Sequence, residues 1–155
     1  MKNKKRIIIF LVICIILSGF GREYMMKNIN WVVKYLTHGG GFWAQSMFKP
    51  LLSWSLKELT ILKWGLTLLF TLYFYALTFA LVKLIFNNKY YSKLTTLTFI
   101  TIFLISFVVY VFGYLINDIQ VIYPTVRNLM GLLQSFIPFM VLYLLFKFIP
   151  QKKHN

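Results

Sequence analysis

Four stretches of the chain are almost free of charged residues, and this feature restricts the fold more than any other. The last three stretches contain 19, 23 and 21 residues, and about 20 residues of helix cross the hydrocarbon core of a bilayer. Only helices or closed barrels satisfy their backbone hydrogen bonds in lipid, and unbroken apolar runs are typical of helices. The four stretches are Ile7–Phe20, Trp64–Val82, Leu94–Ile116 and Leu129–Ile149.

The composition leads to the same fold class. Hydrophobic residues make up 59% of the 155 residues and charged residues only 13%, and a soluble domain of this length has too little interior for so much apolar surface. The sequence therefore predicts an all-α, multi-pass membrane bundle that forms a single integral membrane domain over residues 1–155. We expect four transmembrane helices at about 7–21, 59–83, 94–116 and 128–149, with an outer amphipathic segment at 22–58.

The first apolar stretch has two interpretations. A basic start followed by 14 apolar residues, with Gly19 and Gly21 near its end, is also the pattern of a cleaved signal peptide. Fourteen residues rise only about 21 Å, but Lys and Arg at both ends can snorkel to the interface and so retain the stretch as an anchor. We favour the retained anchor, and both interpretations leave the rest of the chain in one orientation.

The distribution of positive charge predicts that orientation. The net charge is +14, which suggests nucleic acid in a soluble protein, but no soluble basic domain is predicted here and we expect no nucleic acid partner. The positive-inside rule places both chain ends and the loop at 87–93 in the cytoplasm, and we expect the membrane to be a bacterial plasma (inner) membrane. The basic residues on this side are Lys2, Lys4, Lys5, Arg6, Lys83, Lys89, Lys93, Lys147, Lys152 and Lys153.

The connection between the first two spans has a pattern of its own. Residues 22–36 place apolar side chains at helical spacing, which predicts an amphipathic helix lying in the headgroup plane. Gly39–Gly41 should end this helix. Ser55 and Glu58 have the spacing of a capping box, which predicts that the second span begins near Leu56. The four tryptophans are typical of an interfacial aromatic belt, and a peptide-docking surface is the alternative.

Polar residues recur within the expected spans. Pro138 should kink the fourth helix, because its ring displaces the carbonyl of residue 134 and it has no N–H to donate. Gly131 and Ser135 form a small-xxx-small pair that lets another helix approach closely. Residues that share a helix face are Arg127, Gly131, Gln134, Ser135 and Pro138 on the fourth span, Ser106, Tyr110, Gly113 and Asn117 on the third, and Thr67, Thr71, Tyr75 and Thr78 on the second.

The predicted orientation places most residues of these three polar faces in the outer half of the bilayer. The faces have two interpretations. The first is helix packing, with interhelical hydrogen bonds of about 0.6 kcal/mol each. The second is a polar recess that opens outward, with Arg127 at its rim to hold an anionic group through the planar guanidinium. We favour packing, with the anion site as the alternative.

Catalytic chemistry has little support in the sequence. The chain has three carboxylates, Glu23, Glu58 and Asp118, and no pair of them has a suggestive spacing. Its single thiol, Cys14, is expected at the other side of the membrane from His38, which argues against a nucleophile–base pair. We therefore predict that the protein is not an enzyme and has no cofactor and no metal site.

Two segments carry a resemblance to a known family: residues 84–105, LIFNNKYYSKLTTLTFITIFLI, and residues 123–138, YPTVRNLMGLLQSFIP. They resemble the small membrane proteins associated with bacterial exosortase systems, especially the exosortase F type. The shared features are a basic turn after Phe86 and an Arg followed by a Gln-Ser element, here Arg127, Gln134 and Ser135. The resemblance implies a bacterial accessory protein that partners a membrane-embedded sorting protease or transpeptidase.

Two functions from different classes remain after the sequence is read. The first is a non-catalytic integral membrane accessory protein of an exosortase-like protein-sorting system, with the lipid bilayer as its other partner. The second is a small four-helix carrier or flippase component for a lipid-linked molecule. Transporters usually place ionisable groups or broken helices at mid-membrane, and here Pro138 is the expected break.

Overall fold

Every regular element in the described part of the chain is a helix. The computed structural model describes residues 2–116 and 118–148. Five α-helices and one 3-10 helix follow one another along the chain, so the predicted all-α class is confirmed for these residues. The elements are α1 (Lys2–His38), η1 (Ser46–Ser53), α2 (Leu56–Phe86), α3 (Lys89–Leu115), α4 (Ile119–Leu133) and α5 (Ile137–Phe148).

Three of these helices, α1, α2 and α3, are long and apolar enough to cross a membrane. The pair α4 and α5 passes the same test when taken together, although the two helices are bent by 59° at the short break between them. Among the described residues there are therefore three candidate membrane-spanning helices, or four if the bent pair is one broken span. The break lies where Pro138 predicts a kink, and that prediction is confirmed.

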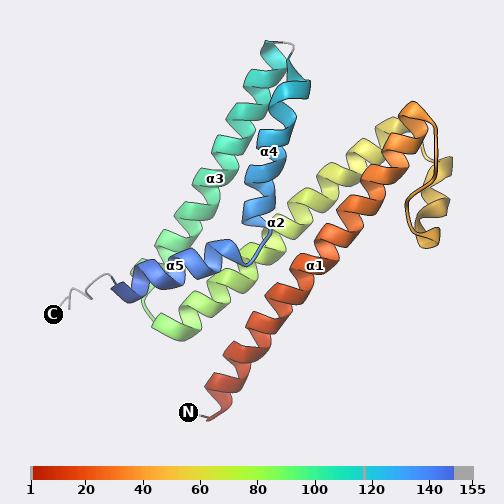
Figure 1. Ribbon diagram of the computed structural model, residues 1–155. Helices are drawn as coiled ribbons and strands as arrows, with labels where there is room; N and C mark the ends of the chain where they lie inside the picture. Colours follow the sequence, from red (N-terminus) through yellow and green to blue (C-terminus); the bar gives the residue numbers. More distant parts are fainter. Residues whose placement is uncertain (1, 117, 149–155) are drawn as a thin grey trace.

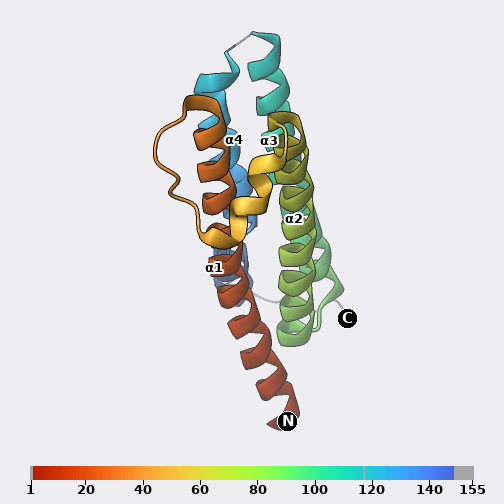
Figure 2. The same cartoon turned by 90° about the vertical axis from the view of Figure 1, so that its right-hand side faces the viewer.

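The helices form two antiparallel arms that diverge (Figure 1). One arm contains α1 and α2, the other contains α3 and α4, and α5 crosses over the lower part of α2. The start of α1, the α2–α3 connection and the end of α5 lie at the end where the arms meet, while the last turns of α1 and α3 lie at the splayed end (Figure 2). The described basic residues that the sequence assigns to one side of the membrane thus lie at one end of the molecule.

Helix α1 differs from the sequence prediction. It continues without a break through the residues expected to form a separate amphipathic helix, and at 1.5 Å per residue it is about 55 Å long. Gly19 and Gly21 each cost about 1 kcal/mol relative to alanine in a helix, but packing on both sides of them holds the helix together. Ile15 is buried against α2 and α5, and Ile29 and Val32 are buried against η1 and α2.

The two ends of α2 are closed by local hydrogen bonds. At its start, the Ser55 N–H donates to Glu58 Oε2 over 2.7 Å and the Glu58 N–H donates to Ser55 Oγ over 3.3 Å. This capping box confirms the predicted start of the helix at Leu56. At its end, Asn87 takes a left-handed conformation (φ 47°) and Asn88 caps α3 through the Tyr90 N–H. Two asparagines are therefore enough to reverse the chain.

The close helix approach occurs at a different glycine from the one expected. Gly131, predicted to admit a neighbouring helix, instead faces the guanidinium of Arg22, which would lie 3.6 Å from an added Cβ. At Gly113 on α3, an added Cβ would lie 3.0 Å from Cβ and Cγ2 of Ile122 on α4. Gly113 is thus the residue whose missing side chain lets α3 and α4 pack together.

We predict that Gly113→Ala destabilises the α3–α4 arm by about 1–3 kcal/mol, the usual cost of overpacking. The measurement is the thermal unfolding midpoint of the protein purified in one detergent. Gly65→Ala is the matched control, because an added Cβ at Gly65 meets nothing within 4 Å. Ile122→Ala should restore part of the lost stability in the double variant. Equal midpoints for Gly113→Ala and Gly65→Ala would contradict the assignment.

Candidate anion-binding recess

A polar recess of about 840 Å³ lies between the two arms. Its walls come from α1, α2, α3 and α4, and its volume is in the range of pockets that hold small molecules. Among the described residues that line it are four basic side chains and one acidic side chain, Glu23. The basic residues are Arg22, Lys27, Lys63 and Arg127.

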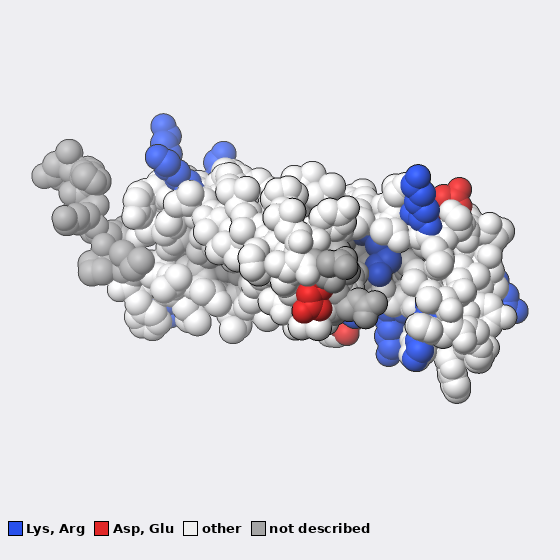
Figure 3. Space-filling model, turned by 90° about the horizontal axis from the view of Figure 1, so that it is seen from above, with Lys and Arg blue, Asp and Glu red and all other residues white. Residues whose placement is uncertain are grey.

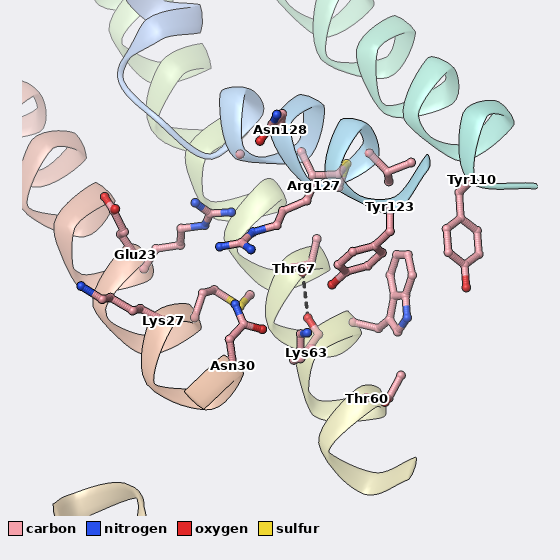
Figure 4. Close-up of a pocket in the computed structure, with 16 residues that line it drawn as sticks. Glu23, Lys27, Asn30, Thr60, Lys63, Thr67, Tyr110, Tyr123, Arg127 and Asn128 are labelled. Atoms are coloured by element: carbon pink, nitrogen blue, oxygen red, sulfur yellow. Dashed lines mark hydrogen bonds between the residues drawn. The ribbon is translucent and has the colours of Figure 1, made fainter. Parts of the chain in front are cut away.

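The basic residues that line the recess belong to three different helices. In Figure 4, Arg127 extends from α4 toward α1 and Lys63 lies on α2, while the side chains of Lys27 and Glu23 on α1 point away from α2 and α4. Figure 3 views the molecule from the splayed end and shows several blue basic groups and few red acidic groups over this part of the surface. The charge of the recess is therefore a product of the packing of distant segments.

A buried glutamine amide joins three helices beside the recess. Gln134, at the end of α4, is only 1% exposed. Its Nε2 donates to the Thr67 carbonyl over 2.7 Å and to Thr71 Oγ1 over 2.8 Å, and both of these acceptors belong to α2. Its Oε1 accepts from Arg22 Nε of α1 over 2.8 Å. Both amide hydrogens and the amide oxygen are thus used, as a buried amide requires.

The orientation of the Gln134 amide follows from its partners. A guanidinium can only donate, so the atom that faces Arg22 must be the oxygen. The nitrogen then faces Thr67 and Thr71. The Thr71 hydroxyl extends the hydrogen-bond network by donating to the Thr67 carbonyl over 2.7 Å. The network fixes the Arg22 side chain at one nitrogen and directs its terminal nitrogens toward Gly131.

Arg22 and Arg127 form a pair of like charges in the recess. Both residues line the recess, and the positive charge of Arg127 repels the guanidinium of Arg22. Glu23 attracts Arg22 but does not balance the lining, which has four basic residues against this one acid. Two guanidinium groups on one cavity are a good match for carboxylate or phosphate oxygens, because each planar fork can bind such a group at two points.

Aromatic rings form the wall of the recess away from α1. The Lys63 ammonium lies 5.6 Å from the centroid of the Tyr123 ring, within the range of a cation–π contact. The rings of Trp64 and Tyr110 meet edge to face with centroids 5.0 Å apart, which joins α2 to α3. Tyr110 and Tyr123 lie on the α3–α4 side in Figure 4.

The structure brings together six of the residues singled out by the sequence. Arg127, Gly131, Tyr110 and Thr67 line the recess, and Gln134 and Thr71 form the network beside it. Gln134 and Thr71 thus fit the packing interpretation, while Arg127 fits the recess interpretation.

The other predicted residues lie elsewhere. The Tyr75 hydroxyl bonds Thr96 of α3 over 2.9 Å. Ser135 lies in the break after α4, where its hydroxyl donates to the Leu132 carbonyl, and Pro138 is buried in α5. Asn117 lies outside the described residues.

Sequence reasoning missed Arg22, Lys27 and Lys63 as members of this site. Arg22 was noted only as a charge that flanks the first apolar stretch, and its partner Gln134 is 112 residues away. Local spacing does not group Arg22 with Lys27, because the two residues are five positions apart and do not share a helix face. Nothing local indicates which face of α4 they meet.

Comparison with protein-family models, with curated proteins and with solved structures found no match to this chain. The resemblance to exosortase-associated proteins therefore stays a prediction. Within residues 2–116 and 118–148, no group of three or more His, Cys, Asp and Glu side chains is arranged to hold a metal ion.

We predict that Gln134→Leu lowers the stability of the protein by about 1–3 kcal/mol, because it leaves the Arg22 Nε–H without its partner and removes the bonds to Thr67 and Thr71. The measurement is the thermal midpoint in detergent for Gln134→Leu, Thr71→Val and the double variant. The cycle should give a coupling near the 0.6 kcal/mol average for membrane helices.

The matched control for this cycle is Thr98→Val. Like Thr71, Thr98 donates its hydroxyl to the carbonyl four residues earlier in its own helix, and it is half-buried where Thr71 is buried. It should be close to neutral and additive with Gln134→Leu. Additivity of Gln134→Leu and Thr71→Val would argue against the network.

Proposed function

We propose that the protein is an integral membrane protein that binds an anionic group in the recess between its two arms. The single observation that carries this proposal is the set of four basic side chains from α1, α2 and α4 on one cavity with one acidic residue among its described lining. Like charges repel one another across a shared cavity, and a bound anion relieves that repulsion. The α1–α2–α4 junction at Gln134 keeps the basic groups together while the site is empty.

The proposed topology has four spans in the bacterial inner membrane, with α4 and α5 as one broken span. Both chain ends and the α2–α3 connection lie in the cytoplasm, in agreement with the positive-inside rule, and the recess then opens on the outer side. The second half of α1 and η1 lie at the outer interface. Trp43 and Met47, 73% and 69% exposed, support this position, because aromatic and apolar side chains are stable in the headgroup region.

We predict that cysteine labelling distinguishes this topology from its inverse. In a Cys14→Ser background, Ser46→Cys should react with a membrane-impermeant maleimide on intact cells, and Tyr90→Cys should react only after permeabilisation. Both positions are exposed, so accessibility within the protein is the same in the two cases. Labelling of Tyr90→Cys on intact cells would contradict the proposed orientation.

We predict that inorganic pyrophosphate raises the thermal midpoint of the purified protein at low salt, and that Arg127→Gln and Lys63→Gln each weaken this binding about fivefold. That factor follows from about 1 kcal/mol per basic residue near a membrane surface. Lys34→Gln is the matched control, since Lys34 lies beside the Trp31 ring, outside the set that lines the recess. Equal effects of all three substitutions would show a nonspecific charge effect and overturn the proposal.

The biological role that we propose is non-catalytic. Among the described residues that line the recess, Glu23 is the one carboxylate. Glu58 is held in the capping box of α2. The described recess therefore does not offer the paired carboxylates that a hydrolase uses. The exosortase-like resemblance of residues 84–105 and 123–138 supports a role as an accessory partner of a sorting enzyme. Co-purification of such an enzyme with this chain, lost on mutation of the α3–α4 arm, tests that role.

The break between α4 and α5 favours a second candidate, a carrier or flippase component for a lipid-linked molecule. Many transporters place their binding sites at discontinuous helices, and Gln134 stands at the end of α4, just before the 59° bend. Transport of a lipid-linked substrate by the purified protein in liposomes would support this candidate over the accessory role.

A further inference from the structure

An apolar groove adjoins the polar recess on its α3 side. The groove is shallow, with a volume of about 40 Å³, and it is bounded by α2, α3 and α4. Four residues line both the groove and the recess, namely Trp64, Tyr110, Val126 and Met130. The two cavities are therefore neighbours across a shared wall, one basic and the other apolar.

The direction of the groove is set by the residues of α3. Tyr110 stands where groove and recess meet, and Phe107, Ser106 and Phe103 follow toward the middle of the helix. Seven residues of helix rise about 10 Å. In the proposed topology this path runs from the outer headgroup region toward the centre of the bilayer, which is the direction of a lipid chain.

The aliphatic hydroxyl of the groove already has a hydrogen-bond partner in its own helix. Ser106, which carries this hydroxyl, is 2% exposed and donates to the Ile102 carbonyl over 2.8 Å. Phe107 is 57% exposed on the outer side of the groove. A methylene chain can therefore lie along this shallow groove, against aromatic and apolar side chains, without leaving the Ser106 hydroxyl unpaired.

We propose that recess and groove together hold one amphipathic ligand, a lipid whose head is a phosphate monoester or diphosphate. The head lies among Arg22, Arg127 and Lys63, and the chain leaves past Trp64 and Tyr110 into the groove. This inference rests on the proposed function and names its ligand class. A phosphate monoester carries about −1.5 to −2 charges at neutral pH, which suits a lining with three more basic than acidic residues.

The test compares a phosphate lipid with a free anion on the full-length protein. The protein is purified from phosphatidylcholine nanodiscs that contain a small fraction of long-chain phosphatidic acid, and retained lipid is measured by native mass spectrometry. Inorganic pyrophosphate binding is measured in parallel by thermal shift. The matched pair of variants is Phe107→Ala and Phe112→Ala, since the two side chains lie on α3 and are 57% and 58% exposed, but only Phe107 lines the groove.

The expected result is selective retention of phosphatidic acid over phosphatidylcholine. Phe107→Ala should lower that retention about fivefold, the scale expected for losing about 40 Å² of apolar contact, and should leave pyrophosphate binding unchanged. Phe112→Ala should change neither. Arg127→Gln should lower both.

Two results would overturn the inference, and they are distinguishable. If pyrophosphate binds in an Arg127-dependent way but Phe107→Ala and Phe112→Ala retain phosphatidic acid equally, the groove holds no chain and the anion site alone stands. If neither pyrophosphate nor phosphatidic acid binds in an Arg127-dependent way, the lipid site and the proposed function both fail.

Discussion

The arrangement of the helices depends on one buried amide. Gln134 ends α4 and bonds α1 through Arg22 and α2 through Thr67 and Thr71. In an apolar environment a side-chain amide without partners is costly, so the three helices are held at the relative positions that satisfy it. The chain then turns by 59°, and the space beyond the junction is left open between the diverging arms.

That open space is what gives the molecule a candidate function. The arms pack against each other at the end that holds the α2–α3 connection, where Val82 of α2 and Tyr91 of α3 are buried together with Phe146 of α5. Toward the splayed end, polar and basic side chains replace this apolar core, and like charges do not pack against one another without a counter-ion. The recess and its excess of positive charge thus both result from the divergence of the two arms, and both point to an anionic ligand.

Sequence patterns predicted the elements well where the causes are local. The start of α2 follows from Ser55 and Glu58, which lie three residues apart, and the bend before α5 follows from Pro138. The amphipathic helix predicted at 22–36 is not separate from the first span, because apolar contacts of Ile15, Ile29 and Val32 with other elements support one long helix. The glycine that permits close packing was also misplaced, since Gly113 and Gly131 have the same local character and differ only in what lies opposite.

The sequence by itself determined that the chain is helical, that its helices suit a membrane, and that Gln134 and Arg127 lie within or beside an apolar span. These properties depend on residue type and on spacing along one helix. Only the tertiary structure decided that Gln134 bonds Arg22, that Arg22, Lys63 and Arg127 line one cavity, and that an apolar groove adjoins it. The physical reason is that these contacts join residues up to 112 positions apart, and no periodicity within a helix specifies which face of another helix it will meet.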